Sequence, residues 1–249
     1  MRFRFSDLLL YILIFIFVAA FPVDLIPVAP IYQLLIIVAL RGLLVAYYIY
    51  IIIKYRIKIF GVANVKNLLL CLPFFLIAAS NMIASGIQGG FTGVIDSPWY
   101  LVLNTIYTLF IAISEEIIFR LFIHNALANT SSIKRIFGSA AIFALMHLIN
   151  IVNVRYLDAL VTVLLQTAYT FGLGLLLGVL YEYSYSLTGA ILLHFSFNFF
   201  NSTLYSYLGG FSSSLAFYLT AIVISVVVGV YALLITIFYF RKYGRFYRQ

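Results

Sequence analysis

Two adjacent carboxylates and an arginine form the most unusual polar group in the sequence. Glu115, Glu116 and Arg120 lie inside a long apolar run that begins near Trp99. A charged side chain at the centre of a bilayer costs at least ~2.5–3.5 kcal/mol on insertion scales, so such residues are usually paired and usually mark a functional site. The chain has only seven Asp and Glu residues, and two of them stand side by side here. The group therefore predicts a functional site at membrane depth.

The spacing separates the two glutamates by role. On a helix, Glu116 and Arg120 are four residues apart and share a face, which favours an ion pair. Glu115 is rotated by about 100° and has no positive partner in its own segment. We therefore expect Glu115 to be available as a general base. The alternative is that the whole group is a structural ion pair between helices, and the unpaired Glu115 argues against it.

Two further apolar runs carry matching polar residues. His147 lies inside one run, and His194 and Asn198, four residues apart on one helix face, lie in another. At about 1.5 Å per residue, His147 and His194 lie ~18 Å and ~12 Å from the same membrane face, close to the expected depth of Glu115. We expect these residues to converge. The remaining histidine, His124, is expected to be an ordinary interfacial residue.

The composition indicates an integral membrane protein. Of the 249 residues, 65% are hydrophobic and 9% are charged, whereas soluble domains have about 25% charged residues. We expect an all-α, polytopic transmembrane helical bundle that forms a single integral membrane domain over residues 1–249. The net charge of +8 does not predict nucleic-acid binding, because the basic residues cluster in short loops between apolar runs. The single cysteine excludes an intrachain disulfide and a Cys-type zinc site.

The apolar runs predict about eight spans. Their approximate bounds are Leu8–Phe21, Ile31–Ile53, Leu68–Ala84, Trp99–Leu127, Ile136–Val152, Ala159–Tyr181, Leu187–Tyr205 and Leu215–Phe240. With this topology, twelve Lys and Arg residues fall on the side of the termini and one, Arg155, falls on the other. Positive residues are enriched in cytoplasmic loops, so both termini are predicted to be cytoplasmic.

The polar residues also resemble a known set of motifs. Glu115-Glu116-x-x-x-Arg120, Phe143-x-x-x-His147 and His194-x-x-x-Asn198 are similar, in order and spacing, to the three motifs of the CPBP (Abi) intramembrane proteases. This family includes CAAX prenyl endopeptidases and bacteriocin-processing or immunity proteins. The resemblance covers a core of about residues 106–201. It implies hydrolysis of a peptide bond within the lipid bilayer, in a membrane-anchored protein or peptide that is either a prenylated CAAX C-terminus, a leader peptide or another anchored substrate.

The resemblance also implies a role for each motif residue. Glu115 would activate a water molecule, and His147 would hold the same water and move its proton. His194 and Asn198 would donate hydrogen bonds to the oxyanion of the tetrahedral intermediate. Glu116 and Arg120 would support the site by fixing their helix. No cofactor is expected.

Three alternatives stay open. A zinc-dependent protease could use the same residues, because two histidines and a glutamate are legitimate ligands, although the H-E-x-x-H spacing is absent. A proton-coupled transporter also uses intramembrane Glu, His and Arg, but it predicts internal repeats and paired broken helices, which we do not find. A non-catalytic immunity or scaffold protein is the third alternative, and the intact motifs count against it.

The topology can be tested with reporter fusions. Reporters placed at Gly90 and at Ser132 should report opposite sides of the membrane, with Ser132 cytoplasmic, because the loops around Ser132 belong to the positively charged side. The same side for both reporters would contradict the predicted topology.

Overall fold

The computed structural model describes residues 5–57, 59, 79, 82, 97–153, 157–184, 186–208 and 214–243. Within these ranges all regular elements are helices and no strand occurs. The predicted all-α class is therefore confirmed for the described part of the chain. The predicted third span, Leu68–Ala84, lies almost entirely outside it.

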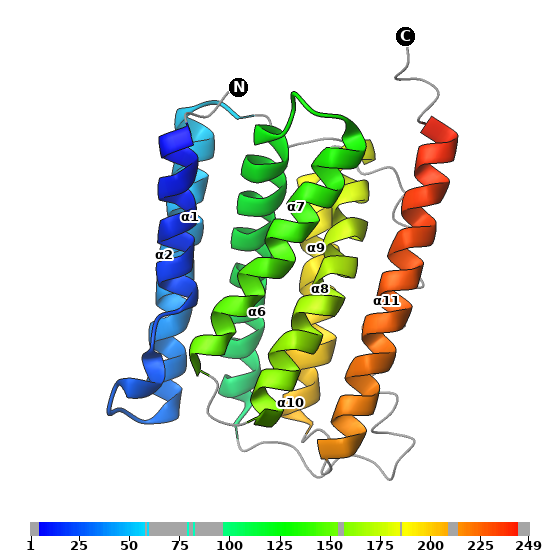
Figure 1. The fold of residues 1–249 in the computed structure, drawn as a ribbon. Coiled ribbons are helices and arrows are strands. Elements are labelled where there is room, and N and C mark those ends of the chain that lie inside the picture. Colours follow the sequence, from blue (N-terminus) through cyan, green and yellow to red (C-terminus); the bar gives the residue numbers. More distant parts are fainter. Residues whose placement is uncertain are drawn as a thin grey trace.

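The first two helices form an antiparallel pair. α1 (Phe5–Ala19) and α2 (Pro30–Lys54) are joined through a short 3-10 turn, η1 (Val23–Leu25). Pro30 begins α2, where its missing N–H removes no helical hydrogen bond. Both helices coincide with predicted apolar runs. In Figure 1 the start of α1 and the end of α11 lie at the same end of the bundle.

The helix that carries the two glutamates changes type directly after them. α6 (Pro98–Glu116) begins at Pro98, with the Ser97 side chain accepting a hydrogen bond from Trp99 N at 3.3 Å. It continues without a break into a π-helix, η2 (Ile117–His124), in which every residue is buried. π-helical segments are rare and occur frequently at functional sites.

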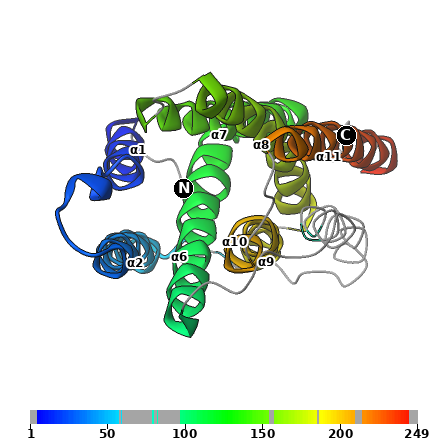
Figure 2. The same ribbon diagram turned by 90° about the horizontal axis from the view of Figure 1, so that it is seen from below.

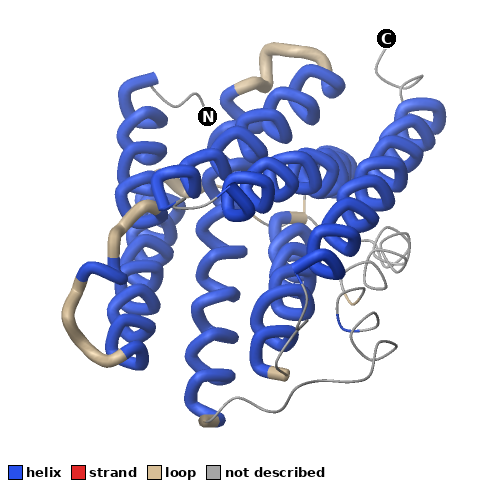
Figure 3. The backbone as a smooth tube through the Cα atoms, turned by 60° about the horizontal axis from the view of Figure 1, so that its bottom comes forward, coloured by secondary structure: helices blue, strands red, loops and turns tan. Residues whose placement is uncertain are grey.

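The remaining elements complete the bundle. They are α7 (Ser132–Met146), the 3-10 helix η3 (His147–Asn153), α8 (Leu157–Ser184), α9 (Leu187–Asn198), the π-helix η4 (Phe199–Leu204), α10 (Tyr205–Tyr207) and α11 (Ser214–Tyr243). Side-chain oxygens of Ser131 and Ser186 cap the starts of α7 and α9 by accepting from Lys134 N and Gly189 N. Figure 3 shows how little of the described chain is loop.

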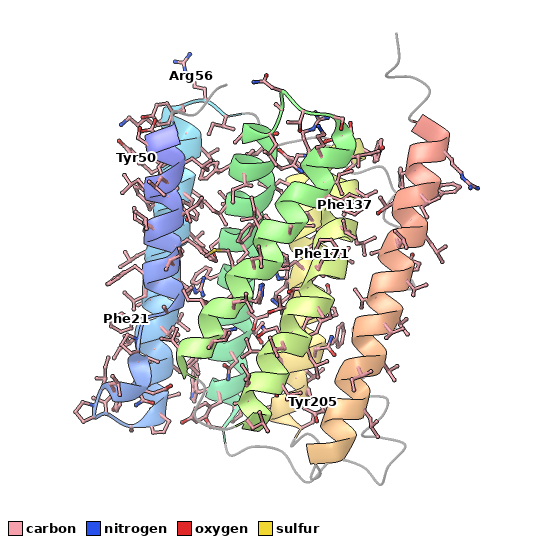
Figure 4. All side chains as sticks on the ribbon, in the orientation of Figure 1. Phe21, Tyr50, Arg56, Phe137, Phe171 and Tyr205 are labelled. Atoms are coloured by element: carbon pink, nitrogen blue, oxygen red, sulfur yellow. The ribbon has the colours of Figure 1, made fainter. Side chains whose placement is uncertain are left out.

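Packing brings the motif helices together. α8 packs against α7 and α11, and α6 packs against α2 and α9; Figure 2, seen along the bundle, shows α6 leaning across its middle. Gly174 allows α8 to approach α7 closely, because a Cβ there would lie 3.0 Å from Ala140 Cα and 3.2 Å from Phe143 Cδ1. Phe137 of α7 and Phe171 of α8 extend this contact, with ring centroids 6.3 Å apart (Figure 4).

The outer surface is apolar, as lipid contact requires. In the described residues, three helices are long and apolar enough to cross a membrane: Pro30–Lys54, Ser132–Val152 and Ala159–Ser184. Ser6–Ala19 and Val226–Tyr239 are shorter apolar helices. On α11 an exposed stripe is formed by Leu219, Val223, Val226, Val230 and Leu234. These features support an integral membrane protein, while the count of about eight spans and the orientation of the termini stay predictions.

Candidate active site

The Glu116 carboxylate is the centre of a buried network between two helices. Glu116 is fully buried at the end of α6. Its Oε1 lies 2.8 Å from His194 Nδ1 on α9, and its Oε2 lies 3.1 Å from Arg120 Nε one turn along its own helix. The arginine contact is close but not aligned as a hydrogen bond. The structure thus brings together the ion pair that the spacing predicted and adds a histidine to it.

His194 lies between the two glutamates. Its Nδ1 contacts Glu116, and its Nε2 lies 3.7 Å from Glu115 Oε2. Because Glu116 is paired with Arg120, its carboxylate accepts and His194 Nδ1–H donates. Nε2 of the neutral ring then has no proton, and it can donate only when the ring carries a second one. The predicted role of His194 as an oxyanion donor is therefore restricted to the doubly protonated ring.

His147 lies where α7 ends and the 3-10 helix η3 begins. Its Nδ1 is 2.9 Å from the Phe143 carbonyl oxygen. A carbonyl only accepts, so Nδ1 carries the proton and Nε2 of the neutral ring offers a lone pair. This is the tautomer that a residue accepting a proton from water needs.

Phe143 holds the charged and aromatic groups of the site in position. Its ring is fully buried, with centroids 4.9 Å from that of His147 and 5.7 Å from that of His194. The Arg120 guanidinium lies over the same ring at 5.2 Å from its centroid. Sequence reasoning included Phe143 in a motif but assigned it no role. The structure shows that it is the shared packing surface of three motif residues.

The four residues predicted to be catalytic line one cavity. Glu115, His147, His194 and Asn198 contribute to a cavity of about 430 Å³. Glu115 is 8% exposed, whereas Glu116 and Arg120 are fully buried and do not line the cavity. The convergence expected from three separate helices is thus present in the structure, with the two adjacent glutamates in different surroundings.

Sequence reasoning missed other polar residues of the cavity wall. They include Asn104, Tyr107, Asn150, Gln166, Tyr169 and Asn201. Asn150 Nδ2 donates to Gln166 Oε1 at 3.0 Å, which links η3 to α8. The available signal was an amide side chain within an apolar run, the same signal that identified Asn198.

His124 belongs to a second network, away from this cavity. It is 1% exposed, and its Nε2 lies 2.7 Å from Glu182 Oε2 while its Nδ1 contacts Ser139 Oγ at 3.2 Å. Arg135 also binds Glu182. The histidine expected to be interfacial is therefore part of a buried connection between η2, α7 and α8, and Glu182 was not foreseen.

A bound zinc ion would need at least three protein ligands close together. Among the residues that the structure describes, no three His, Cys, Asp or Glu side chains are arranged to hold a metal ion. Of the two nitrogens of His194, one is already bonded to Glu116.

Comparison with known proteins concerns a central segment of the chain. Residues 97–200 match a family model described as "Type II CAAX prenyl endopeptidase Rce1-like". Residues 97–200 are Rce1-like. The match confirms the resemblance to the CPBP (Abi) membrane proteases, and it includes Glu115, Glu116, Arg120, Phe143, His147, His194 and Asn198. Searches of curated proteins and of solved structures found no match.

The Glu116 network predicts a strong dependence of folding on charge balance. Glu116→Ala should lower the free energy of unfolding by about 3–5 kcal/mol, because it leaves Arg120 buried without its partner. The double change Glu116→Gln with Arg120→Met should restore the amount of folded protein better than either single change. Thermal unfolding and membrane expression of the three variants would measure this, and strictly additive effects would show that the two residues do not interact.

Proposed function

We propose that the protein is an intramembrane endopeptidase that hydrolyses a peptide bond of a membrane-associated protein or peptide through a water molecule activated by Glu115. A prenylated C-terminus is one candidate substrate. The observation that carries the proposal is the different environment of the two adjacent glutamates. Glu116 is fully buried, ion-paired with Arg120 and hydrogen-bonded to His194, whereas Glu115 lines the cavity with His147 and Asn198. The similarity of residues 97–200 to a model of an endopeptidase family supports the reaction class.

The proposed reaction uses one water and no covalent enzyme intermediate. Glu115 takes a proton from the water, and the oxygen of that water attacks the carbonyl carbon of the peptide bond. His147 Nε2, whose lone pair is set by the Nδ1 bond to Phe143, holds the water and assists the transfer. The carbonyl oxygen becomes an oxyanion, which the Asn198 amide stabilises. Glu115 then gives its proton to the leaving nitrogen, and the C–N bond breaks.

His194 is a positioning residue in this scheme as well as a candidate donor. Its Nδ1 bond to Glu116 fixes the ring, and its Nε2 faces Glu115. In the doubly protonated form, Nε2–H can donate to Glu115 or to the oxyanion. The neutral ring can only orient its neighbours.

A zinc-dependent reaction with the same residues is the alternative mechanism. Zinc would need three protein ligands and an open position for water. Glu115, His147 and His194 would then be consumed as ligands, and Glu116 would have to move protons. Glu116 is fully buried, ion-paired with Arg120 and hydrogen-bonded to His194, which is a poor arrangement for a residue that must move protons. This conflict supports the metal-free mechanism.

Substitution of the proposed base provides the decisive test. Glu115→Gln and His147→Ala should abolish cleavage, and Asn198→Ala should lower kcat by roughly 10²–10³, the usual value of one oxyanion donor. Cleavage is measured by mass spectrometry of shortened peptides in membranes from cells expressing each variant. Asn201→Ala is the matched control, because Asn201 lines the same cavity but donates to the Phe197 carbonyl. Full activity of a folded Glu115→Gln variant would refute the assignment.

The metal-free mechanism makes a separate prediction. Activity should survive exhaustive dialysis against a chelator, and purified protein should contain far less than one zinc ion per chain. Elemental analysis alongside the cleavage assay measures both quantities. Stoichiometric zinc that is lost in Glu115→Gln, together with zinc-dependent recovery of stripped wild-type protein, would establish the metalloprotease alternative.

A further inference from the structure

Arg41 is a buried cation in the wall of the same cavity, contributed by a helix outside the matched family segment. It lies in the middle of α2, 5% exposed, and lines the cavity together with Glu115, His147 and His194. The family match begins at residue 97, so the match assigns it no role. An arginine inside an apolar run can either reach the membrane surface with its long side chain or pair with a carboxylate.

The structure excludes the first of these arrangements. Arg41 is eleven residues from the start of α2 and thirteen from its end, which is ~16 Å and ~20 Å along the helix. Next to it, Gly42 lies against α6, where a Cβ would be 3.1 Å from the Phe110 ring. The close contact between α2 and α6 keeps the Arg41 side chain inside the bundle.

Within the described residues, no carboxylate lies within 4.0 Å of the Arg41 guanidinium. Its Nε and Nη1 have no hydrogen-bond partner there. The Phe15 ring lies below the guanidinium at 5.5 Å, and Tyr107 belongs to the same cavity wall. Both neighbours are uncharged, and the ion pairs of the described residues within 4.0 Å do not include Arg41. A buried charge of this kind is costly unless an anion pairs with it.

We propose that Arg41 binds a carboxylate of the peptide that enters the cavity. A guanidinium is a rigid fork of N–H donors that carries a full charge, and Nε and Nη1 of Arg41 each present an N–H without a partner. The anion is either the α-carboxylate at a peptide C-terminus or the side chain of an Asp or Glu residue. The inference rests on the proposed function for the reaction at Glu115, but binding at Arg41 does not require that cleavage occurs.

A cavity of this size places the bound carboxylate near the reacting bond. The volume of about 430 Å³ is at the small end of ligand sites, so it admits only a short piece of peptide. Arg41 and Glu115 line this one space without forming an ion pair within 4.0 Å. A carboxylate at Arg41 therefore positions a peptide bond a few residues away at Glu115. The competing explanation is that Arg41 is only a distant counter-charge for Glu115, which would not depend on the end of the peptide.

The test compares three farnesylated peptides of one sequence. The first ends in a free carboxylate, the second in a carboxamide, and the third in a carboxamide with Glu as its last residue. Binding is measured by fluorescence anisotropy to purified full-length Glu115→Gln protein, which has no proposed base. The carboxylate peptide should bind roughly ten- to a hundredfold more tightly than the carboxamide, the usual range for a hydrogen-bonded charged group.

Two substitutions assign the preference to Arg41. In Arg41→Gln, made in the same background, the two peptides should bind equally, whereas Arg41→Lys should keep part of the preference because it retains the charge without the fork. Lys54→Gln is the matched control, since Lys54 lies on the same helix but is exposed and outside the cavity. It should keep the full preference. Loss of the preference in Arg41→Gln alone supports the proposal.

The remaining outcomes either overturn the proposal or decide between its two carboxylates. Arg41 is not a carboxylate site if the carboxylate, carboxamide and Glu-ended peptides bind equally. The same conclusion holds if none of the three binds measurably. A preference that survives Arg41→Gln overturns the proposal as well. If the Glu-ended carboxamide alone binds tightly, the site takes an acidic side chain rather than a C-terminus. Wild-type protein that cleaves the first two peptides at equal rates would refute the Arg41 inference and leave the proposed hydrolase function intact. An Arg41-dependent binding preference without any cleavage would support the Arg41 inference and refute the proposed hydrolase function.

Discussion

The neutralisation of Glu116 is the constraint on which the rest of the site depends. A carboxylate with no exposed surface must be paired, and Glu116 is paired twice, with Arg120 on its own helix and with His194 on α9. The second pairing joins α6 to α9 at the depth of the cavity. It also fixes the His194 ring, so that the other nitrogen faces Glu115. One buried carboxylate thus determines the distance between two helices and the orientation of a residue in the proposed reaction.

The π-helix that follows Glu116 is part of the same arrangement. Arg120 lies in η2, four residues after Glu116, and its guanidinium lies over the Phe143 ring. Phe143 in turn contacts both site histidines. Gly174 allows α8 to pack closely against α7 at this position, so the Phe143 ring has little freedom to move. The packing around Phe143 and the ion pair of Glu116 with Arg120 therefore stabilise the same arrangement. Both glutamates are held in place by helices rather than by a loop.

The sequence predicted those features that depend on local spacing. The apolar runs identified the described helices, and the four-residue spacing identified the pairing of Glu116 with Arg120. The depth of His147 and His194 predicted that they converge with Glu115. The π-helix, the end of α7 at His147 and the bond from His194 to Glu116 were not foreseen, because each depends on how helices pack against one another. Only the three-dimensional structure shows which space Arg41 faces.

Two adjacent residues of one type acquire different chemistry here because a helix turns by about 100° per residue. That rotation directs Glu116 into packed side chains and Glu115 into the cavity. Environment rather than residue type separates a structural carboxylate from a reactive one. Arg41 is a second charged residue in the wall of the same cavity. Glu115 and Arg41 balance in formal charge, so an uncharged stretch of peptide enters without meeting a net charge. A carboxylate on that peptide is attracted to Arg41 and repelled by Glu115. On the proposed assignment, this asymmetry selects the direction in which the chain lies and therefore which of its bonds reaches the base.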